Sequence, residues 1–240
     1  MKDYLFLGVV SPQRAQLSLD FKYRFIHKLT NNTGTASVSI ILNQVVVWID
    51  SDNEWDIFDL RNVVSYILQS NLAIIGYLKG YAYEVEITRV LNLAKGIDYV
   101  FGIETPCIEK RNEKINISEK LGEVQAKING ELGVYLSRCF TDLVSAMKNP
   151  EDTGFYCYRA IESLCHHCSY IHNIPVDDKH RSAQWEKFRE ISGSDETALR
   201  TLKEAADPIR HGKPVHISSA GREKLFIITW SVVDHYLTKI

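Results

Sequence analysis

Two side chains near the C-terminal end of the sequence have the chemistry needed to act on a phosphodiester. Arg210 and His216 bracket the segment His211-Gly212-Lys213-Pro214-Val215. A guanidinium is a permanent cation that stabilises phosphate charge, and an imidazole carries a proton near neutral pH. Phosphodiester cleavage uses both, because negative charge builds on the phosphate oxygens while protons move. The segment therefore indicates phosphodiester chemistry.

The helix that carries Arg210 is expected to end within this segment. Pro208 should kink the helix just before Arg210. Gly212, with a proline two residues later, disfavours a helical path to His216, which we therefore expect on a loop. A second interpretation uses the same residues: Gly212 caps the helix, and the positive charges before it favour its carbonyl end.

This arrangement resembles the HEPN superfamily, small helical domains named for higher eukaryotes and prokaryotes nucleotide-binding. Many members carry an arginine, usually followed by a polar residue, with four to six residues before a histidine. Arg210 and His216 enclose five residues, of which His211 is the first. The segment Tyr158–Leu164 resembles the helix whose acidic residue, here Glu162, lies beside the motif. The resemblance covers residues 119–240 and leaves the N-terminal part unexplained.

The resemblance implies a metal-independent endoribonuclease or RNA-acting effector of a prokaryotic toxin or antiphage defence system. His216 would move a proton, and Arg210 would hold the phosphate. His211 would assist, and Glu162 would position Arg210 or a histidine. The resemblance also implies a site built across a homodimer or with a protein partner of the same system, and it calls for no cofactor.

Two other functions remain open. The helical part can be a non-catalytic member of the same superfamily that mediates dimerisation or binds a nucleotide or a protein. The balanced charge of the chain and the proline-interrupted motif favour this alternative. A third possibility is a binding protein whose N-terminal domain is the recognition module.

The helix that precedes the motif also carries possible metal ligands. Cys165, Cys168 and His172 share one face of it, and His180 could complete a zinc site. Two cysteines on one helix lack the tight turn that usually presents them, so a buried core stripe is the favoured interpretation and no metal is expected. Arg159, Glu162 and His166 form the neighbouring polar face, which is either solvated or the wall of a site.

Composition limits the partners and the compartment. The formal net charge is −2, and both parts of the chain are nearly neutral, so nucleic acid could bind only at a local basic patch. No apolar run is long enough to span a bilayer, and the apolar N-terminus is expected to be a first strand and not a signal peptide. Five cysteines without the spacing of a disulfide scaffold are typical of free thiols in the cytoplasm.

The patterning predicts an α+β protein with two domains, a small sheet-plus-helix domain over residues 1–103 and a HEPN-like helical bundle over residues 119–240. In the first, period-two alternation and apolar runs predict strands at 4–10, 15–27, 36–49 and 81–88, and helical spacing predicts a helix at 56–75. The charged residues 104–118 are expected to be a linker.

Helical periodicity continues from there to the last residue. Helices are predicted at 119–147 with a break near Gly130, at 150–172, at 181–191, from a cap at Ser194 to about 209, and from Ser219 onwards. In the third of these, Trp185 and Phe188 are expected to point inward.

Overall fold

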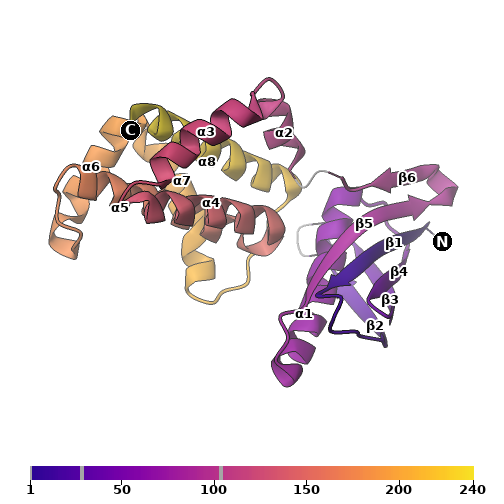
Figure 1. Ribbon diagram of the computed structural model, residues 1–240. Helices are drawn as coiled ribbons and strands as arrows, with labels where there is room; N and C mark the ends of the chain where they lie inside the picture. The colour runs from indigo at the N-terminus through magenta and orange to yellow at the C-terminus, as the bar shows by residue number, and fades with distance from the viewer. Residues whose placement is uncertain (1, 28–29, 103–104) are drawn as a thin grey trace. The chain divides into compact units, whose positions relative to one another are not determined.

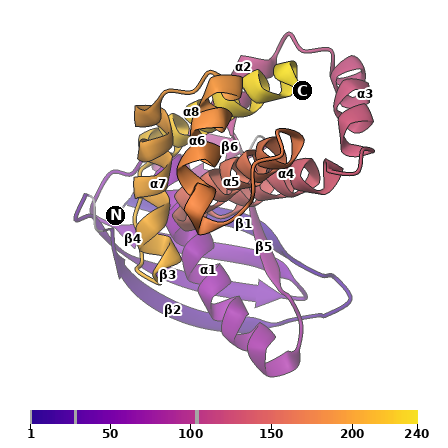
Figure 2. The same ribbon diagram turned by 90° about the vertical axis from the view of Figure 1, so that its left-hand side faces the viewer.

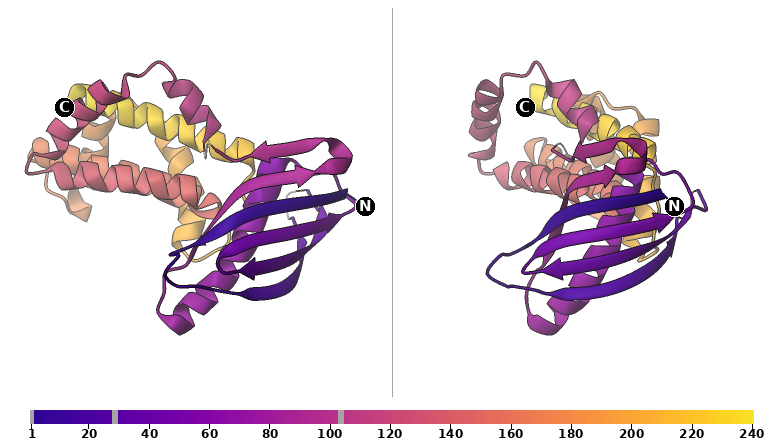
Figure 3. Two further views of the ribbon diagram at one scale, coloured as in Figure 1. Left: turned by 45° about the vertical axis from the view of Figure 1, so that its right-hand side comes forward. Right: turned by 90° about the vertical axis from the view of Figure 1, so that its right-hand side faces the viewer.

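Alternating apolar residues in the N-terminal part of the chain form the buried face of one antiparallel sheet. The computed structural model describes residues 2–27, 30–102 and 105–240, and it divides into two units, Met1–Ile103 and Glu104–Ile240. The sheet has the order β2-β3-β4-β1-β5-β6 (Figure 3). Its strands are β1 (Lys2–Ser11), β2 (Leu19–Ile26), β3 (Thr33–Ile41), β4 (Gln44–Ser51), β5 (Glu84–Asn92) and β6 (Ile97–Val100). The α+β class expected from the sequence is confirmed.

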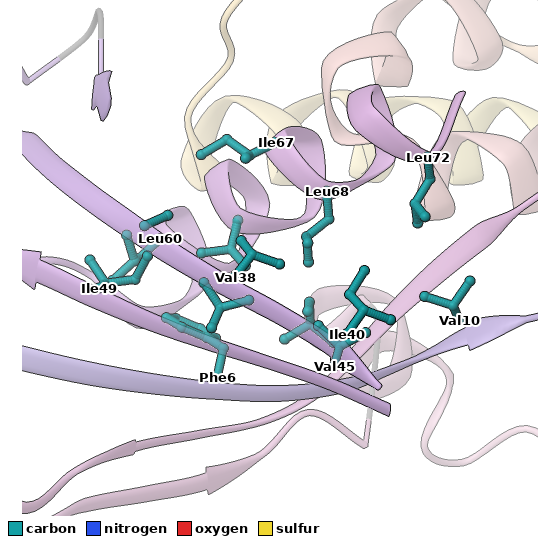
Figure 4. Packing of buried hydrophobic residues seen from close by; sticks show 14 of the residues in the cluster. Phe6, Val10, Val38, Ile40, Val45, Ile49, Leu60, Ile67, Leu68 and Leu72 are labelled. Carbon is teal, nitrogen blue, oxygen red and sulfur yellow. The ribbon is translucent and has the colours of Figure 1, made fainter. Parts of the chain in front are cut away.

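One long helix, α1 (Ile57–Lys79), covers one face of this sheet (Figure 3). The helix begins at Asp56, whose carboxylate accepts hydrogen bonds from the backbone N–H groups of Phe58 and Asp59. Leu60, Leu68 and Leu72 recur at helical spacing and are fully buried against the sheet (Figure 4). The core of this unit therefore lies between α1 and the inner face of the sheet.

The expected strand over 36–49 is in fact two strands. β3 and β4 are joined by Leu42 and Asn43, whose φ angles of 47° and 68° are those of a tight hairpin turn. Leucine is not a turn residue, so the apolar run concealed the reversal. Asn43 is 4% exposed, its side-chain oxygen accepts from the Leu17 N–H at 2.7 Å, and its amide donates to the Pro12 carbonyl.

The same turn explains why the prediction for the second strand was too long. Residues 15–18 form a loop that is hydrogen-bonded to the Asn43 side chain through the Leu17 N–H. Strand β2 therefore starts at Leu19 instead of Ala15. The strand expected at 81–88 is displaced to β5, and the short strand β6 gave too few alternating residues to be recognised.

The C-terminal unit is helical throughout its regular structure (Figure 1). Its helices are α2 (Pro106–Asn112), α3 (Ile117–Ile128), α4 (Gly133–Lys148), α5 (Thr153–Ile171), α6 (Arg181–Ser192), α7 (Glu196–Arg210) and α8 (Ser219–Lys239). The predicted break near Gly130 is confirmed. The cap expected at Ser194 is wrong by one residue, because the Asp195 carboxylate accepts from the Ala198 N–H at 2.6 Å. No helix within the described ranges is long and apolar enough to cross a membrane.

The prediction of a linker over 104–118 is largely wrong for residues 105–118, while residue 104 lies outside the described residues. Pro106 starts α2, a position where its missing N–H costs nothing, and Ile108 is 8% exposed within the helical core. The charged residues around Ile108 concealed this single anchoring side chain.

Helix α5 occupies the centre of the helical unit and packs on α4, α6, α7 and α8 (Figure 2). Gly154 allows a close approach, since a Cβ there would lie 2.8 Å from the Cβ and the carbonyl oxygen of Ala205 on α7. At the other end of α5, buried His167 shares a 2.7 Å hydrogen bond through Nδ1 with the Tyr236 hydroxyl on α8. Burial lowers the pKa of His167.

We expect the hairpin turn to depend on Asn43. Replacing Asn43 with alanine leaves the buried Leu17 N–H without its acceptor and places a non-glycine residue without polar compensation at positive φ. The free energy of unfolding should fall by about 2–4 kcal/mol in urea titrations. Asn43→Gly keeps the backbone conformation accessible and should lose less. Equal losses in the two variants would contradict the contribution of positive φ, and wild-type stability in both would contradict the whole account.

The buried imidazole should make stability depend on pH. Since the pKa of His167 is lower in the folded than in the unfolded state, the unfolded chain binds more protons below about pH 6.5. The free energy of unfolding should therefore be largest above that pH and fall as the solution is acidified. His167→Gln should reduce this slope between pH 7.5 and 5, whereas the control His166→Gln, at an exposed neighbour, should retain it. A retained slope in His167→Gln would refute the assignment.

Candidate functional site

The helix that carries Arg210 ends with a glycine cap. Gly212 has φ of 72°, its N–H donates to the Ile209 carbonyl at 2.9 Å, and the Lys213 N–H donates to the Pro208 carbonyl at 2.9 Å. This pair of bonds is the Schellman motif. Helix α7 continues through Pro208 to Arg210, and the interpretation of Gly212 as a helix cap is confirmed. His216 lies in the irregular segment that follows, as expected.

The structure brings Arg210 and Glu162 together. A guanidinium nitrogen of Arg210 lies 3.5 Å from a Glu162 carboxylate oxygen, linking the end of α7 to the middle of α5. Both side chains line a cavity of about 560 Å³ together with Cys165, His166 and Arg181. The lining also includes Asp177 and Asp178, so two guanidiniums face three carboxylates there. This cavity has no excess of positive charge.

His216 contacts a residue just before the start of the same helix. Its Nδ1 lies 3.3 Å from a carboxylate oxygen of Glu151, in the short turn Pro150–Asp152 that leads into α5. Because a helix rises about 1.5 Å per residue, the nine steps from Thr153, where α5 begins, to Glu162 correspond to about 14 Å, and Glu151 lies in the turn before them. Six extended residues reach about 20 Å, so the segment from Arg210 to His216 can span that distance. Arg210 and His216 thus contact two different carboxylates, one in the middle of α5 and one just before it.

The His211 side chain is exposed, and the backbone N–H of this residue takes part in the hydrogen bonds that end α7. Its N–H donates to the carbonyls of Asp207 and Pro208 at 3.2 Å. Among the described side chains that line the Arg210 cavity, neither His211 nor His216 is present, and the histidine found there is His166.

The polar side chains of α5 have two different kinds of partner: some line the Arg210 cavity, and one pairs with α4. Glu162 and His166 line the cavity, as one of the two interpretations expects. Arg159 instead forms a two-pronged ion pair with the fully buried carboxylate of Asp142 on α4, and one of its hydrogen bonds measures 2.9 Å. Arg159 is therefore a structural link between α4 and α5.

The thiols on α5 are part of the core. All five cysteines are free, and four of them are buried. Burial raises the pKa of Cys165 to about 12, so the thiol that borders the cavity stays protonated at neutral pH. His180 pairs with Asp177 at 2.7 Å. Within the described parts of the chain, no three His, Cys, Asp or Glu side chains are grouped to hold a metal ion.

A second cavity, which was not predicted from the sequence, adjoins the first. It measures about 380 Å³ and shares Arg181 and Trp185 with the Arg210 cavity. Trp185 packs against the helical core, as expected, but unlike the fully buried Phe188 it is half-buried and also lines both cavities. The available signal was the spacing of Arg181, Trp185 and Arg189, which recur every four residues on one face of α6.

The remaining lining residues make this second cavity basic. Arg200 and Lys203 come from α7 and add to Arg181 and Arg189, so the cavity is lined by four cations and one carboxylate, Glu196, while Lys203 also pairs with Asp207 at 3.1 Å. The chain as a whole carries a net charge of −2, so the cavity is a local concentration of positive charge.

Comparisons with known proteins identify the family of the chain, but they do not assign an activity to it. No curated protein and no solved structure matches the chain. Two family models do match: the N-terminal domain of the domain of unknown function DUF8168 over residues 4–101, and its C-terminal domain over residues 121–240. The two models correspond to the sheet unit and to the greater part of the helical unit. The chain therefore belongs to the DUF8168 family, with both of that family's domains in sequence order.

Proposed function

We propose that the helical unit is a HEPN-like module that binds a nucleotide or RNA without cutting it. The observation that carries this proposal is the separation of Arg210 from His216. Arg210 contacts Glu162 in α5 and His216 contacts Glu151 in the turn before it, with about 14 Å of helix between that turn and Glu162. A catalytic pair must reach one phosphate, with each polar atom within about 3 Å of its target. Contacts to two separate carboxylates do not favour that geometry within one chain.

Binding requires less precise geometry than cleavage. Cations clustered in a cavity attract phosphate groups even when the protein as a whole is slightly acidic. Arg181, shared by both cavities, joins the Arg210 site to the basic one beside it. These features support the non-catalytic alternative suggested by the balanced charge of the chain.

Ribonuclease activity is the second candidate, and one observation favours it. His166, Arg210 and Glu162 line the same cavity, so an imidazole, a guanidinium and a carboxylate are available at one place. In this version His166 replaces His216 as the proton carrier, or a second copy of the chain supplies His216. The three carboxylates of that cavity would oppose phosphate binding, and this favours the first proposal.

A cleavage assay separates the two candidates. Single-stranded RNA incubated in EDTA with the wild-type protein should stay intact, because the two motif residues Arg210 and His216 contact different carboxylates. The variants Arg210→Ala, His216→Ala and His166→Ala should behave identically, and His235→Ala is a matched control at an exposed histidine on α8.

Cutting by the wild type that is lost in Arg210→Ala and kept in His235→Ala would overturn the binding-only proposal. The histidine variant that also loses activity would then identify the proton carrier. Circular dichroism of each variant excludes loss of the fold as the cause.

A further inference from the structure

The basic cavity is bordered by two helices that each supply cations at regular intervals. Arg181 and Arg189 project from α6, and Arg200 and Lys203 project from α7. Guanidiniums bind phosphate through two parallel hydrogen bonds, and such charge-assisted bonds are about twice as strong as neutral ones. A volume of about 380 Å³ falls within the usual range for small-molecule sites.

An aromatic wall closes one side of this cavity. The Trp185 indole stacks on the Tyr158 ring with centroids 5.9 Å apart and planes 12° apart, and both rings line the cavity. Phe188 contacts the indole edge-on at 5.9 Å and 87°. The two contacts hold the indole in one orientation, so it offers a preformed flat surface to a planar ring.

Glu196 lines the cavity and supplies a negative charge there, although its side chain is 62% exposed. One of its carboxylate oxygens lies 2.7 Å from Arg200, and the other lies 3.6 Å from Arg189. The carboxylate thus bridges α6 and α7 where a ligand phosphate would bind the same two guanidiniums. A polyphosphate carries more charge and more acceptor oxygens than one carboxylate, so it can displace Glu196.

We propose that this cavity binds a nucleoside polyphosphate, with its phosphates on Arg189, Arg200 and Lys203 and its base against Trp185. The inference rests on the proposed binding function, but it places the ligand beside the Arg210 cavity and not within it. The same base-and-phosphate chemistry occurs in a free nucleotide and in single-stranded RNA. The size of the cavity favours the free nucleotide, and Glu196 acts as its resident competitor.

The test is a set of calorimetric titrations of the full chain, with Trp fluorescence as a second readout. The probes are adenosine triphosphate, inorganic triphosphate, adenosine and a short single-stranded RNA. Adenosine triphosphate should bind most tightly, and its affinity should fall as salt rises. Arg189→Gln and Arg200→Gln should each weaken binding about tenfold. Arg24→Gln removes the same charge from the other unit and should change nothing.

Glu196→Gln provides the sharper variant, because a loss of fold could not imitate its effect. Removing the competing carboxylate should tighten adenosine triphosphate binding several-fold, while Asp195 continues to cap α7. Unchanged or weaker binding in Glu196→Gln would refute the competitor role. Inorganic triphosphate that binds as tightly as adenosine triphosphate would refute the role of Trp185.

The remaining outcomes separate this inference from the proposed function. If Arg210→Gln weakens binding and the two cavity variants do not, the ligand lies in the Arg210 cavity, so the inference fails and the proposed function stands. If RNA alone binds and the cavity variants weaken it, the site is correct and the free-nucleotide assignment is wrong. If no probe binds the wild type, both proposals fail.

Discussion

A single buried helix determines where the charged side chains of the helical unit can reach. Helix α5 packs on four other helices, so its residues cannot shift without disturbing the core. Glu162 lies in the middle of α5 and Glu151 lies in the turn that leads into it, and each contacts one member of the Arg–His pair suggested by the sequence. Arg210 and His216 are close in sequence, but they contact carboxylates that lie at different places along the chain. This separation is the reason for preferring binding over cleavage.

Charge then distinguishes two cavities that share a wall. The Arg210 cavity holds more carboxylates than guanidiniums, whereas its neighbour holds four cations and one carboxylate. An anionic ligand is attracted to the site with the more positive local potential, whichever residues form the motif. Neighbouring cations add to one another's attraction for such a ligand where water is partly excluded. Arg181 and Trp185 lie at the boundary of both cavities, so a ligand in the basic cavity would also contact residues that border Arg210.

Much of the fold could be predicted from periodicity, and the failures have definite physical causes. Leu42 concealed a hairpin because an apolar residue there adopts positive φ, and α2 was concealed because one buried side chain, Ile108, anchors an otherwise charged segment. Glu162 could be placed near Arg210 through a family resemblance, and the two are in contact. The partner of His216 could not be predicted, because the path of an irregular segment depends on tertiary contacts. The basic face of α6 was visible in the four-residue spacing of Arg181, Trp185 and Arg189, but only Trp185 and Phe188 were singled out in this helix, both as inward-facing residues.

The central claim is that one chain cannot place Arg210 and His216 on the same anion. A crystal structure of the protein grown with sulfate tests it directly. The account predicts Arg210 beside Glu162, His216 beside Glu151, and sulfate bound among the cations contributed by α6 and α7. A single sulfate contacted by both Arg210 and His216 of the same chain would contradict it.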